Sequence, residues 1–143
     1  MRTMDTNSIA NAEQNKNVVR RFFQAFGAAD TKALDQLLTS DFVPHGMPPG
    51  YSSDTNGLKK MAADFKAALG DCSNEIQDLV AAEGDKVVAR FRTQAVHKGE
   101  LFGVPPSGRA ITMTGMEMYR VSGDKIAELW GEYNVSELFG TGA

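Results

Sequence analysis

The amino-acid sequence predicts an α+β domain in which three helices come first and an antiparallel sheet of about four strands follows. Three segments before residue 70 repeat apolar residues at helical spacing. From Ser73 onward the apolar period changes to two, which is the repeat of strands that bury one face. Helices followed by strands is an α+β order, so we expect the three helices to pack together on one face of the sheet.

The first two helices are predicted to form a hairpin. The first ends at Gly27, and its apolar stripe consists of Val18, Val19, Phe22, Phe23 and Phe26. Asp30 can cap the second helix, which is expected to end at the polar residues 39–41. Its apolar side is formed by Leu34, Leu37 and Leu38.

A short segment over residues 42–45, a loop and a third helix follow. Residues 46–57 (GMPPGYSSDTNG) contain too much proline and glycine for regular structure. The third helix is closed by Gly70 and carries a stripe made of Leu58, Met61, Ala62, Phe65 and Leu69.

Four strands are predicted at about residues 74–83, 86–98, 109–121 and 125–135. The tight turns Gly84-Asp85 and Gly123-Asp124 join the first pair and the last pair as antiparallel hairpins. The middle strands are connected by a longer loop with the sequence HKGELFGVPPSGRA. This connectivity predicts a four-stranded meander.

Composition and charge limit the partners. We expect residues 1–143 to form one domain, with residues 1–13 as a flexible or loosely ordered segment. A net charge of −3 argues against a nucleic-acid partner. No segment approaches the roughly 20 apolar residues needed to cross a bilayer, so we expect no membrane partner and a cytoplasmic location. The single Cys72 and two distant histidines make no metal motif, so we expect no metal.

A pocket is predicted between the helices and the concave face of the sheet. Methionine and aromatic side chains mixed with isolated polar groups are typical of small-molecule sites. The candidate ligand-binding residues of this kind are Met61, Phe65, Phe91, Met113 and Trp130. The alternative is that the methionines fill gaps in a solid core.

Several segments of the second half match one known family in order and spacing. They are residues 82–88 (AEGDKVV), 96–101 (VHKGEL), 103–108 (GVPPSG), 119–121 (YRV) and 125–130 (KIAELW). With the opening segments 18–26, 30–35 and 42–45, the chain resembles the SnoaL-like polyketide cyclase family over roughly residues 14–138. The resemblance implies the cone-shaped α+β barrel shared by ketosteroid isomerase, scytalone dehydratase and limonene epoxide hydrolase. It also implies chemistry without a cofactor, and a homodimer.

The resemblance suggests two functions. The cyclases use an acidic side chain on the last strand to move a proton next to a carbonyl, but this chain has Gly131 and Asn134 at the two positions where the family commonly carries acids. One hypothesis is therefore a cofactor-free enzyme that acts on a small hydrophobic carbonyl compound with other acids. The second hypothesis is a non-catalytic protein that binds a small hydrophobic ligand.

Two glutamates are the candidate acids. Counting pairs from the Gly123-Asp124 turn sets Glu117 opposite Trp130, and Gly115 opposite Glu132. On this count Glu117, Glu132 and Asn134 share the face of Trp130, with Asn134 as a further ligand-binding residue. The spacing Trp130-Gly131-Glu132-Tyr133 is also similar to the last strand of limonene epoxide hydrolases, so we place Glu132 in the pocket and Glu117 next to it. The alternative sets both glutamates on the outer face, paired with arginines.

The two histidines complete the candidate catalytic residues. His45 and His97 each lie at the end of a predicted strand, beside a loop rich in glycine or proline. In the family, histidines at such points border the pocket mouth, which suits a hydrogen-bond donor or proton shuttle. A structural role, such as binding a loop carbonyl, is the alternative for both.

Overall fold

The computed structural model describes residues 6–140, and its helices lie where the apolar stripes predict them. These are α1 (Thr6–Ala28), α2 (Thr31–Leu37) and α3 (Thr55–Leu69). Asp30 and Asp54 cap α2 and α3 by accepting hydrogen bonds from backbone N–H groups of the first turn. At the end of α3, Gly70 adopts a positive φ of 62°, a conformation that glycine tolerates without strain.

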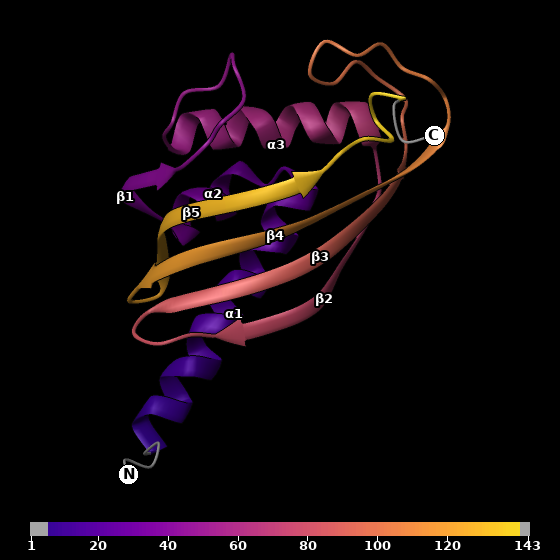
Figure 1. Ribbon diagram of the computed structural model, residues 1–143. Helices are drawn as coiled ribbons and strands as arrows, with labels where there is room; N and C mark the ends of the chain where they lie inside the picture. Colours follow the sequence, from indigo (N-terminus) through magenta and orange to yellow (C-terminus); the bar gives the residue numbers. More distant parts are fainter. Residues whose placement is uncertain (1–5, 141–143) are drawn as a thin grey trace.

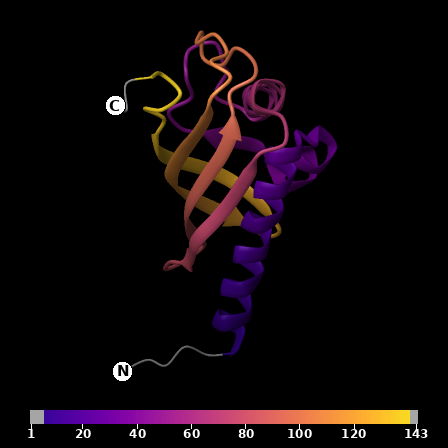
Figure 2. The same ribbon diagram turned by 90° about the vertical axis from the view of Figure 1, so that its right-hand side faces the viewer.

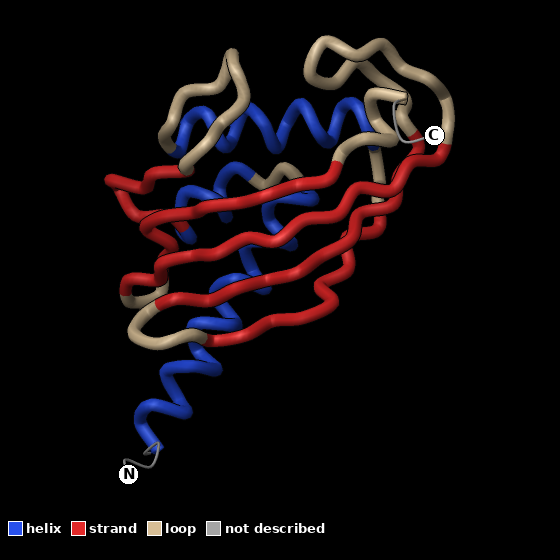
Figure 3. The backbone as a smooth tube through the Cα atoms, viewed as in Figure 1, coloured by secondary structure: helices blue, strands red, loops and turns tan. Residues whose placement is uncertain are grey.

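The sheet has five strands instead of the predicted four (Figure 3). They are β1 (Leu38–Pro44), β2 (Ser73–Ala81), β3 (Lys86–Val96), β4 (Ala110–Ser122) and β5 (Lys125–Asn134), in the order β1-β5-β4-β3-β2. Strands β2 to β5 form the predicted antiparallel meander, whereas β1 pairs in parallel with β5. The sheet is therefore mostly antiparallel, and its strands curve around the helices (Figure 2).

Strand β1 was missed because its sequence does not alternate cleanly. Its first half continues the apolar side of α2, and the polar residues 39–41 suggested the end of that helix. In the structure Leu38, Phe42 and Pro44 are buried, while Ser40 and Asp41 are exposed. Its register against β5 is irregular between Leu38 and Val43. An irregular edge strand of this kind leaves no period of two in the sequence.

All three helices cover one face of the sheet, as predicted (Figures 1 and 2). Phe22 of α1 is buried and packs edge-on against Tyr119 of β4, with ring centroids 5.7 Å apart. Leu34 is fully buried in the same cluster, whereas Phe23, Phe26 and Phe65 are only partly buried. This cluster lies between the helices and the sheet, and a second buried cluster around Leu69, Leu101 and Met113 lies at the end of α3.

Helix α1 begins earlier than expected. The sequence predicted a loosely ordered segment over residues 1–13, but residues 6–13 are already helical, and residues 1–5 lie outside the described part of the chain. No proline or glycine precedes Gly27, so nothing in the sequence breaks the helix before that point. In Figure 1 the first turns of α1 project beyond the edge of the sheet. Within residues 6–140, no helix is long and apolar enough to span a membrane.

A β-bulge changes the predicted register of the last hairpin. Val121 pairs with Ile126 as predicted, but Arg120 pairs with Glu128, which leaves Ala127 as an extra residue on β5. Beyond the bulge every pair is displaced by one residue. Glu117 is therefore opposite Gly131 rather than Trp130, and Glu132 is opposite Met116 rather than Gly115. Because side chains alternate across a strand, this single residue exchanges the two faces of β5 relative to β4.

Candidate functional site

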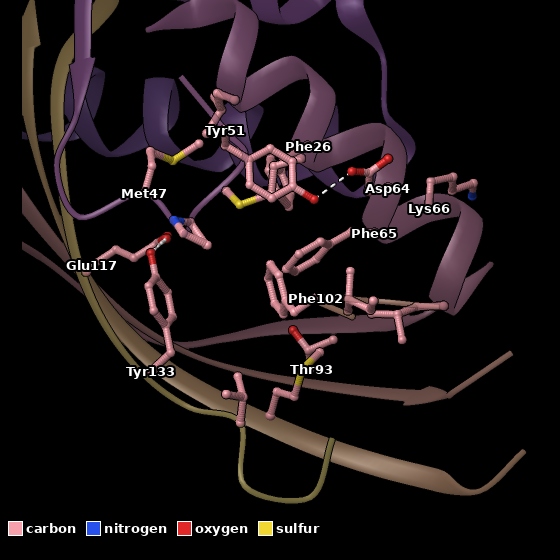
Figure 4. A pocket seen from close by; sticks show the side chains of 18 of the residues that line it. Phe26, Met47, Tyr51, Asp64, Phe65, Lys66, Thr93, Phe102, Glu117 and Tyr133 are labelled. Carbon is pink, nitrogen blue, oxygen red and sulfur yellow. Dashed lines mark hydrogen bonds between the residues drawn. The ribbon is translucent and has the colours of Figure 1, made fainter. Parts of the chain in front are cut away.

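A cavity of about 1050 Å³ lies between the concave face of the sheet, α1 and α3. Its lining combines aromatic, methionine and leucine side chains with glycines and isolated polar groups, and α1, α3, β3, β4 and β5 all contribute to it. Figure 4 shows Phe65, Phe102 and Thr93 on one side of the cavity and Glu117 with Tyr133 on the other. The volume lies at the upper end of the range for small-molecule sites.

One wall of the cavity carries a carboxylate held by two tyrosines. Tyr119 donates a hydrogen bond to Oε1 of Glu117, and Tyr133 of β5 donates one to Oε2 at 2.5 Å. Glu117 and Tyr119 are two residues apart on β4, so they share the concave face. Tyr133 is on the same face because Gly131, its neighbour two positions away, is the cross-strand partner of Glu117.

The surroundings of this carboxylate shift its proton affinity. Burial raises the pKa of Glu117 above its ordinary value, and the two tyrosine hydrogen bonds offset only part of that increase. The pKa values of Tyr119 and Tyr133 are also raised, first by burial and then by the charge of Glu117. Near neutral pH both tyrosines therefore stay protonated donors. Glu117 titrates closer to neutrality than an ordinary glutamate.

Two glycines make room for Tyr133. A carbon added to Gly131 would collide with the hydroxyl group of Tyr133. A carbon added to Gly115 would lie 2.7 Å from Cδ1 of Tyr133 and equally close to the ring of Phe91. Because neither glycine has a side chain, the Tyr133 ring lies over the two strands and its hydroxyl reaches Glu117.

Two loops meet at the cavity opposite this carboxylate. Tyr51, in the loop 45–54, donates a hydrogen bond to Asp64 of α3 at 2.6 Å. Its ring lies edge-on to Phe102 of the loop 97–109, with centroids 6.4 Å apart. Burial and the carboxylate of Asp64 raise the pKa of Tyr51 to about 12. Residues from both loops line the cavity, so the loops border the space a ligand would enter.

The strand pairing does not turn Glu132 toward the cavity as its predicted register would. Glu132 borders the cavity at its rim, but its pairing with Met116 sets it on the outer face of the sheet, where it is exposed. Trp130 pairs with Met118 on the same outer face and is only half-buried. Asn134 is exposed opposite Thr114, and its Oδ1 accepts a hydrogen bond from the backbone of Ser136. Neither Trp130 nor Asn134 lines the cavity.

His45 borders the cavity, but its ring is engaged on the outer face. The imidazole stacks on Trp130 with centroids 5.0 Å apart, and its Nε2 lies 2.8 Å from Oε2 of Glu128. Glu128 also accepts a hydrogen bond from Arg120, and these two contacts lower the pKa of Glu128. The structure therefore places the His45 ring in an ion-pair network that does not include Glu117.

His97 is fully buried outside the cavity lining. Its backbone N–H donates to Arg109, and its carbonyl accepts from Gly108, both at 2.9 Å. These bonds close the base of the loop 97–109. Its ring Nδ1 lies 3.5 Å from the hydroxyl of Ser107, and Nε2 has no hydrogen-bond partner among the described residues. This geometry matches the structural alternative better than a catalytic role.

The four remaining candidates, Met61, Phe65, Phe91 and Met113, all line the cavity. The sequence analysis gave no role to Tyr119 or Tyr133. A tyrosine stands two positions after Glu117 on β4 and two positions after Gly131 on β5. This spacing becomes a signal only once the register is known to pair Glu117 with Gly131. Within residues 6–140, no three side chains of histidine, cysteine, aspartate or glutamate come together as metal ligands would.

Fold and site together define a class of protein. A curved sheet closed by three helices around a largely apolar cavity, with the carboxylate of Glu117 in the sheet wall, is the architecture of a small-molecule α+β barrel. The model of the SnoaL-like polyketide cyclases matches residues 16–140. The chain therefore belongs to the SnoaL-like polyketide cyclase family, a family of small-molecule cyclases.

Solved structures agree with this assignment. TsrD from Streptomyces laurentii is 22% identical with a TM-score of 0.76, covering 97% of this chain and 99% of its own. IdmH from Streptomyces antibioticus, provisionally named a polyketide cyclase, is 29% identical with a TM-score of 0.75. The match covers 90% of this chain and 97% of IdmH. AclR from Streptomyces galilaeus, provisionally named a hydroxylase, is 23% identical with a TM-score of 0.75, covering 91% and 87%. None of the curated proteins shows significant sequence similarity to the chain.

Proposed function

We propose that this protein is a cofactor-free acid/base enzyme that moves a proton next to a carbonyl group of a small hydrophobic compound, with Glu117 as the catalytic acid/base. The observation that carries the proposal is the pairing of Glu117 with Gly131. Position 131 is where the family commonly carries an acid, and directly opposed side chains on a sheet lie about 5 Å apart. The carboxylate is thus supplied by the neighbouring strand instead of the last one.

The surroundings of Glu117 support proton transfer. A base is most effective when its pKa lies near the working pH, and burial moves the pKa of Glu117 in that direction. In the proposed step the carboxylate takes a proton from the carbon next to the carbonyl. The electron pair of that C–H bond forms a double bond to the carbonyl carbon, and the π pair of the carbonyl group moves onto its oxygen. The resulting enolate needs a hydrogen-bond donor. The half-exposed Tyr133 donates to the ionised Glu117, and its hydroxyl can turn to the enolate oxygen once Glu117 has taken the proton.

The test follows exchange of α-hydrogen for deuterium in a panel of aromatic and polyketide-like ketones, by NMR in D₂O. We expect the wild type to accelerate exchange for some members and Glu117→Gln to lose 10²–10⁴ of that rate. Glu132→Gln is the matched control, because it makes the same change one face away, and it should keep the wild-type rate. Equal loss in both variants, or full activity in Glu117→Gln, would contradict the proposal.

The alternative function, a non-catalytic protein that binds the same class of ligand, gives a different result. In that case panel compounds would raise the melting temperature, since a ligand at a hundred times its dissociation constant stabilises by about 2.7 kcal/mol. None of them would exchange faster with the protein than without it. The exposed position of Asn134 and the glycine at position 131 are the features that favour this reading.

We also propose that the chain forms a homodimer through the outer face of the sheet, as the family resemblance suggests. This face exposes Val80 and Met116, which are 55% and 52% accessible. It also carries both signs of charge, in pairs such as Arg90 with Asp78 and Arg120 with Glu128. A face that combines exposed apolar groups with balanced charges can meet a second copy of itself across a two-fold axis.

A further inference from the structure

We propose that Asn74 and Thr93 form a second polar subsite, which binds a hydroxyl or carbonyl oxygen at the far end of the ligand. Both residues line the cavity. The inference rests on the proposed function, because it takes the end of the ligand that reacts to lie at Glu117. It adds a substrate class: elongated, rigid, apolar molecules that carry an oxygen at each end.

The two side chains are joined across neighbouring strands. Asn74 of β2 and Thr93 of β3 are direct cross-strand partners, and the Thr93 hydroxyl donates to Oδ1 of Asn74 at 2.5 Å. Thr93 is only 7% exposed, so its polar group is buried in an otherwise apolar wall. Figure 4 shows Thr93 facing the cavity, on a different side from Glu117.

This pair keeps unused hydrogen-bonding capacity. A threonine hydroxyl has one donor and two acceptor sites, and an asparagine amide has two N–H donors besides its oxygen. Among the described residues, the Thr93–Asn74 bond is the hydrogen bond that these side chains make, which leaves the amide N–H groups of Asn74 free. Met113, the other cross-strand neighbour of Thr93, offers no polar partner. Asn74 is exposed, so a ligand oxygen in the cavity could accept a hydrogen bond from its amide N–H groups beside the buried Thr93.

A glycine on α1 leaves space for this amide. A carbon added to Gly27, which also lines the cavity, would lie 2.9 Å from Nδ2 of Asn74. That separation is closer than side-chain carbons normally approach, so an alanine at position 27 would displace the amide. The position of the amide thus depends on Gly27.

The distance between the two polar positions sets the length of the ligand. Ala89 of β3 is the partner of Glu117, and Thr93 lies four residues further along the same strand. Four residues of strand span about 13 Å. Phe91 and Gly115, which pair with each other, lie between the two positions. The wall between them is therefore apolar and carries an aromatic ring, which suits an apolar ring system in the ligand.

The experiment compares two rigid three-ring probes that differ by one oxygen. We would measure the affinities of 2,6-dihydroxyanthraquinone and 2-hydroxyanthraquinone by calorimetry, a readout that needs no turnover. One added neutral hydrogen bond of typical strength corresponds to about a fivefold gain in affinity. The wild type should therefore prefer the dihydroxy compound by about fivefold. Thr93→Val, which keeps the shape of the side chain, and Asn74→Leu should both abolish this preference.

Two further variants sharpen the result. Thr93→Ser keeps a hydroxyl and should retain the preference, whereas Gly27→Ala should reduce it by displacing Asn74.

A preference that persists in Thr93→Val and Asn74→Leu would overturn the subsite. Equal affinity of the wild type for both probes would overturn it as well, while leaving Glu117 as acid/base untouched. If neither probe binds the wild type, the cavity does not take such ligands, and the subsite fails. Loss of exchange in Glu132→Gln but not in Glu117→Gln would instead overturn the proposed function alone.

Discussion

Glu117 combines two opposing effects on one carboxyl group. Burial disfavours its charged form, while the hydroxyl groups of Tyr119 and Tyr133 stabilise that form by donating to it. Burial is the larger effect, so the pKa of Glu117 is raised. The two tyrosine hydrogen bonds thus limit how far burial raises the pKa of Glu117.

Removing one of these donors should raise the pKa of Glu117 further. Tyr133→Phe removes a hydrogen bond to the charged form, so the carboxylate becomes a stronger base but ionises at higher pH. A base acts in its ionised form, so the midpoint of the pH–rate profile for α-hydrogen exchange should move to higher pH. A hydrogen bond to a charged group contributes about 1.5–3 kcal/mol when buried, and because Tyr133 is half-exposed we expect a shift of about one pH unit.

The control for this change is Tyr51→Phe. It removes a tyrosine hydroxyl that donates to Asp64 instead, so the midpoint of the profile should stay in place. A midpoint that moves to lower pH in Tyr133→Phe would mean that Tyr133 does not stabilise the carboxylate.

At the residue scale, the sequence predicted some of the site correctly. Period-two alternation placed Glu117, Met113 and Tyr119 on one face, and the structure keeps them together. The face of Glu132 was predicted by counting cross-strand pairs from β4 to β5. The bulge at Ala127 displaces those pairs by one residue, so the predicted face is the opposite one. Nothing in the local sequence marks Ala127 as the extra residue, since alanine occurs both in regular strands and in bulges.

Among the elements, helix α1 carries the largest share of aromatic packing. The Phe22 ring contacts Phe23, Phe26 and Tyr119, with centroids 5.7–6.4 Å apart. Tyr119 is in turn a hydrogen-bond donor to Glu117, so α1 supports the site from behind. The strong helical period of this segment explains why the sequence predicted it correctly, whereas the irregular β1 gave no comparable signal.

Truncating the central ring of α1 should destabilise the fold. Phe22 is only 3% exposed, and replacing a buried phenylalanine by alanine typically costs about 3–5 kcal/mol. Chemical denaturation of Phe22→Ala should show a loss in this range. Gln24→Ala, on the exposed side of the same helix, should change the free energy of unfolding by no more than about 0.5 kcal/mol. A loss below about 1 kcal/mol in Phe22→Ala would mean that this side of α1 does not pack on the sheet.

For the whole molecule, the two faces of the sheet have different tasks. The concave face and the helices enclose the cavity, whereas the outer face exposes apolar residues such as Met116 between ion pairs. This is the face through which we propose that the homodimer forms. The sequence could not separate the two faces of β5, because that requires the register that the bulge alters.

The proposed homodimer predicts the effect of a charge on the outer face. Met116→Lys places an ammonium group in the centre of the proposed interface, where it would lose hydration without gaining a partner. Sedimentation velocity should show a dimer for the wild type and a monomer for Met116→Lys. Gln24→Lys adds the same charge on α1 and should stay dimeric. A monomeric wild type at tens of micromolar would contradict the proposal, as would a dimer that tolerates Met116→Lys.

If Glu117 is the proton-exchanging group of the cavity, a pH titration of its carboxyl carbon should reveal it. In protein labelled with ¹³C at glutamate side chains, the NMR signal that disappears in Glu117→Gln should titrate at a higher pH than an exposed glutamate, whose ordinary pKa is about 4.3. Glu132→Gln is the assignment control, because the signal of Glu117 should remain in its spectrum. If the Glu117 signal titrates together with the exposed glutamates, or below them, its environment does not tune it for proton transfer and the account is contradicted.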